Sequence, residues 1–324
     1  MEQRRLGRSG LRVSRLALGT MTWGRDTDVH EARDQLEAFA ELGGTLVDTA
    51  ASYGDGQSER VLGELLESVV PRAEIVVATK AGMSRMSGRR VVDVSRRALL
   101  DQLDASLDRL DTDYVDLWQV QTWSDDVPPD ETLAALDYAV TSGRARYVGV
   151  SNYGGWQTGW SAAHQASVPS RVPLVSTQVE YSLVQRGIER EVLPAAAGLG
   201  LGVLAWSPLG RGVLTGKYRT GTPADSRAAS PHLAGFVEAY LDPRSRQVVE
   251  AVSTAAEGLG VQPLEVALAW VRDRPGVTAP VVGARTAAQL RGVLAVEELT
   301  LPAEIRSALD EISVPPLGYP ERLW

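Results

Sequence analysis

The chain contains 324 residues, of which 44% are hydrophobic and 23% are charged, and it carries a net charge of −8 and no cysteine. The lack of cysteine excludes a disulfide framework and a thiolate metal site, which fits a reducing cytoplasm. The acidic balance argues against general nucleic-acid binding, although an acidic surface can still contain a local basic pocket for a phosphate.

Neither a targeting signal nor a membrane segment is visible in the sequence. Residues 1–10 are polar and basic, without the apolar core of a signal peptide, and no apolar run is long enough to cross a bilayer. We therefore expect a soluble cytoplasmic enzyme. Because no stretch carries a large exposed apolar face, a monomer is the default, and the oligomeric partner stays unknown.

Short apolar runs alternate with longer segments whose apolar residues are three and four positions apart, a pattern that indicates alternating strands and helices. A hairpin is predicted first, over residues 3–15. The predicted strands then cover residues 16–18, 45–48, 75–79, 115–120, 147–150, 175–179, 202–206 and 279–282. The predicted helices cover residues 29–42, 58–66, 95–107, 130–141, 155–165, 189–197, parts of 244–272, and 286–294.

This alternation of eight strands with helices predicts a (β/α)8 barrel, which we expect to form one domain over residues 1–324. No GxGxxG motif follows an early strand, which argues against a Rossmann sheet. Residues 207–242 are too long for an ordinary connection and are interpreted as a functional flap. Residues 301–324 are expected to hold a helix to about residue 312, followed by an irregular C-terminal tail.

Polar residues follow each predicted strand, at the ends that share one rim of a parallel barrel. Asp48, Tyr53 and Lys80 bring a carboxylate, a phenol and an amine to neighbouring strand ends. A nearby ammonium lowers the pKa of a tyrosine by favouring phenolate, and a carboxylate can fix that ammonium in place. A single polar residue of this kind could merely end a strand, but the whole set predicts a general acid for a substrate carbonyl.

Several segments carry a specific resemblance: RRLGRSGLRVSRLALGTM, VDTAASYG, ATKAG, GVSN, TQVEYSL, AWSPLGRGVLTGKY and VVGARTAAQL. In these segments the chain resembles the aldo-keto reductase family, and the resemblance covers essentially the whole length of the chain. It is most similar to the branch with the potassium-channel β subunits and many bacterial reductases. The resemblance implies a catalytic tetrad of Asp48, Tyr53, Lys80 and Gln121, in which Tyr53 is the general acid, Lys80 tunes it and Asp48 pairs with Lys80.

Gln121 departs from the family pattern, which usually has histidine at this position. A glutamine amide can orient a carbonyl by hydrogen bonding, but it cannot relay a proton. Gln121 is therefore compatible with a weak carbonyl reductase, with an altered reaction, or with an engineered change. The three histidines, His30, His164 and His232, are interpreted as solvated or structural, and no metal site is expected.

The resemblance also implies a nicotinamide dinucleotide bound across the rim. Trp206 offers a flat face for the nicotinamide ring, and the amides of Asn152 and Gln178 can bind its carboxamide. Arg285, at a helix start, suits a 2′-phosphate and so favours NADPH over NADH. The expected cofactor residues are Gly19, Thr20, Met21, Asp48, Ser151, Asn152, Gln178, Trp206, Ser207, Pro208, Leu209, Gly210, Gly212, Lys217, Arg227, Gly283, Arg285 and Gln289.

One part of the expected cofactor site is incomplete. Related proteins often carry Glu and Asn where this chain has Gly292 and Val293, which predicts fewer contacts with adenine.

The function that follows is hydride transfer from NADPH to the carbonyl of an aldehyde or ketone, with Tyr53 protonating the oxygen. The substrate pocket is expected to be formed by the C-terminal tail and by a largely aromatic set of residues: Trp23, Tyr53, Met83, Trp123 and Tyr153. Two alternatives stay open. One is reduction of an activated C=C bond or an unsaturated sugar, and the other is a slow-turnover regulatory subunit that senses NADPH.

Overall fold

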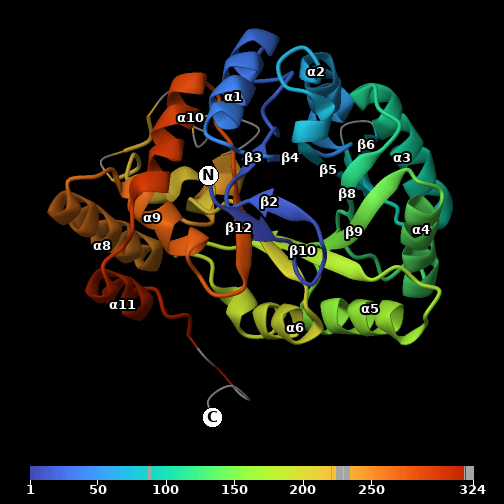
Figure 1. The fold of residues 1–324 in the computed structure, drawn as a ribbon. Coiled ribbons are helices and arrows are strands. Elements are labelled where there is room, and N and C mark those ends of the chain that lie inside the picture. Colours follow the sequence, from blue (N-terminus) through green and yellow to red (C-terminus); the bar gives the residue numbers. More distant parts are fainter. Residues whose placement is uncertain (87–88, 220, 224–228, 230–233, 317, 319–324) are drawn as a thin grey trace.

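The computed structural model describes the whole chain except residues 87–88, 220, 224–228, 230–233, 317 and 319–324. Eight parallel strands close into a barrel in the order β10-β11-β12-β3-β4-β5-β8-β9, which confirms the predicted (β/α)8 architecture (Figure 1). The barrel strands are β3 (Ala17–Gly19), β4 (Leu46–Asp48), β5 (Val76–Ala81), β8 (Val115–Val120), β9 (Ala145–Ser151), β10 (Leu174–Glu180), β11 (Gly202–Trp206) and β12 (Val277–Val282).

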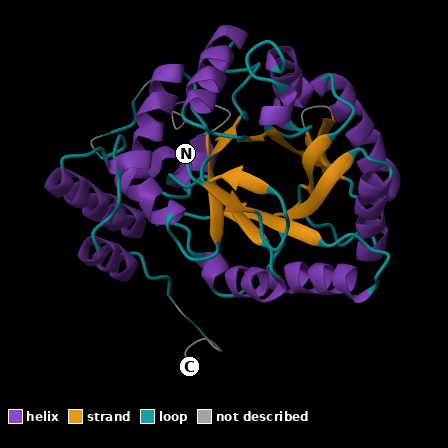
Figure 2. Cartoon of the chain, in the orientation of Figure 1, coloured by secondary structure: helices purple, strands orange, loops and turns teal. Residues whose placement is uncertain are grey.

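Helices surround this barrel on its outer side (Figure 2). They are α1 (Val29–Glu41), α2 (Gln57–Leu65), α3 (Arg96–Leu110), α4 (Pro129–Thr141), α5 (Gly155–Ser167), α6 (Val192–Leu199), α7 (Ala234–Glu238), α8 (Pro243–Leu259), α9 (Pro263–Arg272), α10 (Ala287–Leu294) and α11 (Ala303–Ile312). Short 3-10 turns lie at Tyr53–Gly56, Arg72–Glu74, Gly187–Glu189, Gly210–Thr215 and Ala295–Glu298.

Helix α3 shows why the sequence pattern produces this packing. The Ser95 side chain caps the first turn by accepting a hydrogen bond from the Ala98 backbone N–H. Leu99, Leu103, Leu107 and Leu110 then recur three or four residues apart and are buried against the barrel. Burial of each leucine contributes about 1.5–3 kcal/mol, so the apolar stripe fixes which face of the helix meets the strands.

The predicted amino-terminal hairpin is present as β1 (Gln3–Arg5) and β2 (Arg12–Ser14), and it closes the amino-terminal end of the barrel (Figure 1). Leu6 and Val13 are fully buried in a cluster with barrel residues such as Leu117 and Leu204. Gly7 allows this approach, because a Cβ there would lie 2.4 Å from the Gly200 carbonyl oxygen. With this end filled, the open rim of the barrel is the one formed by the carboxyl ends of the strands.

The structure differs from the sequence predictions in two connections. A second hairpin, β6 (Met83–Met86) and β7 (Arg89–Val92), stands between β5 and α3, where only a connection was expected. The helix expected over residues 189–197 begins at Val192 instead, after a separate 3-10 turn. Pro194 explains this later start, because proline fits the first turn of a helix but breaks an interior turn.

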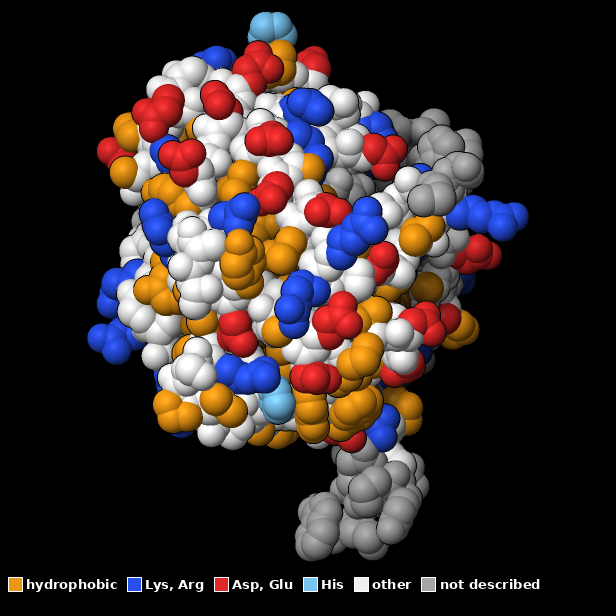
Figure 3. Space-filling view, turned by 90° about the vertical axis from the view of Figure 1, so that its right-hand side faces the viewer, with side chains coloured by type: hydrophobic (Ala, Val, Ile, Leu, Met, Phe, Trp, Pro, Cys, Tyr) orange, Lys and Arg blue, Asp and Glu red, His pale blue; other side chains and the backbone are white. Residues whose placement is uncertain are grey.

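Among the described residues, no helix is long and apolar enough to cross a membrane. Acidic and basic side chains are interspersed over the face shown in Figure 3, which carries helices from the right-hand side of Figure 1.

Candidate active site

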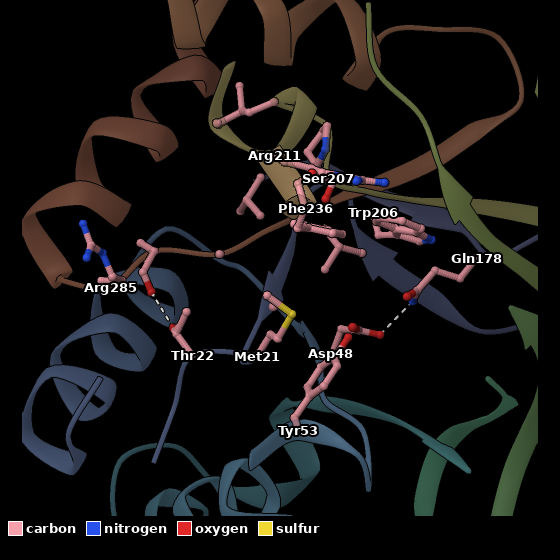
Figure 4. A pocket seen from close by; sticks show the side chains of 18 of the residues that line it. Met21, Thr22, Asp48, Tyr53, Gln178, Trp206, Ser207, Arg211, Phe236 and Arg285 are labelled. Atoms are coloured by element: carbon pink, nitrogen blue, oxygen red, sulfur yellow. Dashed lines mark hydrogen bonds between the residues drawn. The ribbon is translucent and has the colours of Figure 1, made fainter. Parts of the chain in front are cut away.

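A cavity of about 910 Å³ opens at the carboxyl ends of the strands, and each of the eight barrel strands contributes a residue at or just beyond its end. Predicted site residues that line it are Gly19, Met21, Asp48, Tyr53, Lys80, Met83, Gln121, Ser151, Asn152, Gln178, Trp206, Ser207, Pro208, Leu209, Gly212, Lys217, Gly283, Arg285 and Gln289. In Figure 4, Tyr53 and Asp48 lie across the pocket from Trp206 and Ser207, and Arg285 lies at the far left.

Asp48, Lys80 and Tyr53 meet at the floor of this cavity. The Lys80 Nζ donates hydrogen bonds to Asp48 Oδ2 at 2.7 Å and to the Thr49 carbonyl oxygen at 2.8 Å. The same ammonium lies 5.2 Å from the centroid of the Tyr53 ring. Asp48 and Lys80 are each only 1% exposed, so their attraction acts where water screens it little.

Burial dominates the protonation of this group. It raises the pKa of the Tyr53 phenol above its ordinary value, and the opposing effect of the Lys80 ammonium does not cancel it. The sequence-based expectation of a lowered pKa is therefore wrong in its net direction, although it gave the direction of the lysine's own effect. Burial also favours neutral Lys80, but Asp48 and Tyr53 outweigh it and raise the pKa of Lys80. At neutral pH the phenol holds its proton and the amine its charge.

Gln121 lies beside this group with its amide oriented by a neighbour. The Ser52 Oγ donates a hydrogen bond to Gln121 Oε1 at 3.0 Å. Because this bond occupies the side-chain oxygen of Gln121, the amide NH2 group remains available as a donor to a ligand. The Asn152 Nδ2 donates to the Gln121 carbonyl oxygen at 2.9 Å, which ties the end of β8 to the end of β9.

The next strand ends form a connected amide and indole set. The Trp206 Nε1 donates to Asn152 Oδ1 at 2.9 Å, and the Gln178 Nε2 donates to Asp48 Oδ1 at 2.8 Å (Figure 4). The Ser151 hydroxyl is bonded to the Gln178 carbonyl oxygen. The Gln178 amide therefore links Asp48 on the cavity floor to the expected cofactor side, and the hydrogen bond to Asn152 fixes the indole edge of Trp206, which lines the cavity.

Backbone strain gathers at the same rim. Asn152, Ser207 and Arg211 line the cavity, and all three have positive φ values, of 57°, 50° and 58°. Non-glycine residues rarely adopt this left-handed region, and such residues cluster at binding sites. Gly212 has a φ of 95°, and a Cβ there would lie 3.4 Å from Lys217 Nζ. Glycine adopts this conformation without strain, and it leaves the backbone beside Lys217 without a side chain.

The loop after β12 forms the far side of the cavity. The Thr22 hydroxyl donates to the Ala284 carbonyl oxygen at 2.9 Å, and the Thr27 hydroxyl donates to the Arg285 carbonyl oxygen at 3.1 Å. The Gln289 side chain accepts from the Arg285 backbone N–H at 3.0 Å. These contacts hold the Arg285 backbone at the start of α10, next to the N-cap Thr286.

Some predicted site residues do not reach the cavity. Thr20 is buried and bonded to Ser58, and Gly210 packs on Val184. The prediction of Trp23 as a substrate residue is wrong for this structure, because its ring is fully buried and its Nε1 donates to Gln35 Oε1.

Two further predicted aromatic residues fall outside the cavity lining, and one predicted arginine cannot be placed. Trp123 and Tyr153 pack edge to face with ring centroids 5.1 Å apart, and neither lines the cavity. Arg227 lies outside the described residues, as do His232 and most of the C-terminal tail.

A model of the aldo/keto reductase family matches residues 15–314 of the chain. The chain belongs to the aldo/keto reductase family. It is 38% identical to an uncharacterized oxidoreductase, YrpG, of Bacillus subtilis (strain 168), over 98% of each chain. It is 36% identical to a probable voltage-gated potassium channel subunit beta of Oryza sativa subsp. japonica, over 88% of this chain and 87% of that one. It is 32% identical to an L-glyceraldehyde 3-phosphate reductase of Escherichia coli (strain K12), over 96% and 92%.

These matches confirm the predicted family and branch, and they identify the chain as an oxidoreductase of a family that uses nicotinamide cofactors. Among the described residues, no group of His, Cys, Asp and Glu side chains could hold a metal ion. The barrel therefore presents an acid, an amine and a phenol beside a cavity of a size that suits a dinucleotide and a small substrate.

Sequence reasoning missed several residues of this aldo/keto reductase site. Arg211 lies between two glycines that were predicted, and its guanidinium forms two hydrogen bonds to Glu180, at 2.8 and 2.7 Å. It also donates to the Phe236 carbonyl oxygen at 2.7 Å and so joins the flap to β10. Its position inside the AWSPLGRG segment was the available signal. The other missed lining residues include Thr22, Arg25, Ser52, Arg85, Arg90 and Phe236.

Proposed function

We propose that this protein reduces the carbonyl group of an aldehyde or ketone to an alcohol with NADPH as the hydride donor. The observation that carries the proposal is the buried contact of Lys80 with Asp48, 2.7 Å long, beneath the ring of Tyr53 in the rim cavity. This arrangement provides a protonated phenol next to a fixed positive charge, as proton donation to a developing alkoxide requires.

The residues of the cavity fit a nicotinamide dinucleotide. The indole of Trp206 offers a flat face, Gln178 and Asn152 bring amides to the adjoining strand ends, and Gly212 leaves backbone space beside Lys217. Arg285 supports NADPH over NADH, because a guanidinium binds a 2′-phosphate through charge-assisted hydrogen bonds. When bound, the cofactor supplies the hydride to the carbonyl carbon.

The side chains divide the remaining work. The Gln121 amide, oriented by Ser52, donates a hydrogen bond that holds the carbonyl oxygen. Tyr53 transfers its proton to that oxygen as negative charge develops, and Lys80 stabilises the phenolate that remains. The Asp48 carboxylate keeps the ammonium in position and charged.

A direct test follows the loss of NADPH absorbance with a panel of aldehydes, ketones and enones. Turnover of aldehydes or ketones supports the proposal. Turnover of enones alone supports a second candidate, a C=C reductase, which is favoured by the glutamine at position 121 in place of the usual histidine. Tight NADPH binding without any turnover supports a third candidate, a cofactor-sensing subunit, which is suggested by the similarity to the potassium channel β subunits.

The cofactor preference has its own test. We expect Arg285→Gln to raise the KM for NADPH by about tenfold, because one charge-assisted contact is lost. The KM for NADH, which has no 2′-phosphate, should change little. An equal effect on both cofactors would contradict the role proposed for Arg285.

A further inference from the structure

The unpredicted hairpin β6–β7 brings two arginines to the cavity. Arg85 and Arg90 both line it, and they lie directly opposite each other in the antiparallel register of the hairpin. Like charges at directly opposed positions destabilise an antiparallel pair. The fold therefore carries an unfavourable contact at this position that an anion between the two guanidiniums would relieve.

Nothing in the described part of the chain neutralises this pair. No carboxylate among the described residues lies within ion-pair distance of Arg85 or Arg90, and the hydrogen bonds of Arg90 go to the thioether of Met83. A thioether is a weak acceptor and carries no charge. Other cavity arginines differ, because Arg211 pairs with Glu180 at 2.7 Å and Arg25 pairs with Asp26 at 2.6 Å.

The hairpin is on the substrate side of the proposed site. The hairpin follows β5, the strand that carries Lys80. In the ring of eight strands β5 is four places from β11, so the end of β5 lies directly across the barrel from the end of β11, where the flap begins. The loop that carries Arg285 follows β12, which is separated from β5 by β3 and β4. The expected phosphate contacts of the cofactor therefore lie away from Arg85 and Arg90.

We propose that Arg85 and Arg90 bind a carboxylate or phosphate group of the carbonyl substrate, so that this reductase selects anionic aldehydes or ketones. The inference rests on the proposed function and names the substrate class of that site. Guanidinium groups bind both anions through paired hydrogen bonds. In a chain with a net charge of −8, a local cationic pair also attracts anions that the rest of the surface repels.

The test compares 4-carboxybenzaldehyde with its methyl ester, and 4-formylphenyl phosphate distinguishes phosphate from carboxylate. We expect kcat/KM to favour an anionic aldehyde over the ester by about tenfold or more. Arg85→Gln and Arg90→Gln should each lower this ratio by about tenfold, mainly through KM, and added salt should lower it further. Arg89→Gln is the matched control, since Arg89 belongs to the same hairpin but does not line the cavity.

Two outcomes would overturn the inference: equal kcat/KM for acid, phosphate and ester, or a loss of selectivity in Arg89→Gln as large as in the other two variants. If no aldehyde is turned over, the proposed function fails, and calorimetry still decides the anion site. Tighter binding of 4-(hydroxymethyl)benzoate than of its methyl ester, lost in Arg90→Gln, would support the site. Equal binding of the two compounds would refute it.

Discussion

The floor of the cavity and its outer loops are built on different principles. On the floor, Asp48 and Lys80 extend from the ends of adjacent strands, are nearly inaccessible to solvent and satisfy each other at 2.7 Å. In the outer loops, Arg85 and Arg90 are exposed on a two-stranded hairpin and have no carboxylate partner among the described residues. The barrel thus holds the groups that we propose to react in fixed positions, whereas the exposed hairpin presents positive charge to an entering ligand.

The difference indicates where chemistry and selectivity reside. Changes on the floor should affect every substrate, because the buried charges are coupled to the fold and to Tyr53. Changes at Arg85 and Arg90 should affect particular ligands, because these two side chains have no carboxylate partner among the described residues. Each of the following predictions tests one side of this contrast.

The largest effect is expected from removing the proton donor. Tyr53→Phe deletes only the hydroxyl, so kcat should fall by about 10²–10⁴-fold for every carbonyl substrate, as expected for the loss of a general acid. Titration of the protein with NADPH, followed by fluorescence, should give unchanged affinity. Retention of more than a tenth of the activity would show that another group donates the proton.

Breaking the buried ion pair should cost stability as well as activity. Lys80→Met leaves the Asp48 carboxylate buried without its cation, and we expect the free energy of unfolding in urea to fall by about 3–5 kcal/mol. The double variant Lys80→Met with Asp48→Asn removes both charges and should recover part of this loss. A double variant no more stable than the single one would argue against an uncompensated charge.

The same pair predicts alkaline sensitivity. The pKa values of Tyr53 and Lys80 are both raised above their ordinary values of 10.0 and 10.5, so the folded protein holds both protons more tightly than the unfolded chain. This contribution to stability is complete at lower pH and is lost as the pH rises above about 10. Urea unfolding at a series of pH values should show this decline, and Tyr53→Phe should lessen it.

The sequence predicts the floor far better than the loops. Asp48 and Lys80 could be placed because each ends an apolar run, and parallel strand ends converge in a barrel. The Arg85 and Arg90 pair could not, because a short polar hairpin has no buried face to produce a strong period-two pattern. Trp23 was misplaced because an indole near a strand end looks the same in sequence whether it faces a ligand or the core.

A gain-of-function variant at position 121 should show whether this residue only orients the substrate carbonyl or could also help to protonate it. Gln121→His introduces a group that can both bind the carbonyl and assist its protonation, so carbonyl reduction should accelerate by about tenfold or more. Steady-state kcat with a neutral aldehyde is the measurement, and Gln121→Asn serves as a control that keeps an amide. An unchanged or lower rate in Gln121→His would reject the claim that this position limits protonation.

The smallest effects should come from the Arg–Glu ion pairs of the loops, where the burial of each pair determines how much its loss costs. Arg211 and Glu180 are 15% and 13% exposed, whereas Arg219 and Glu250 form a similar two-bond pair at 40% and 56% exposure. Arg211→Ala should lower the free energy of unfolding by about 1–2 kcal/mol, because it leaves the mostly buried Glu180 carboxylate without its partner. It should also weaken NADPH binding, because the contact between the flap and β10 is lost. Arg219→Ala should change neither measurably, because water already screens its pair. Equal losses in the two variants would mean that flap anchoring depends on the number of ion pairs rather than on their burial.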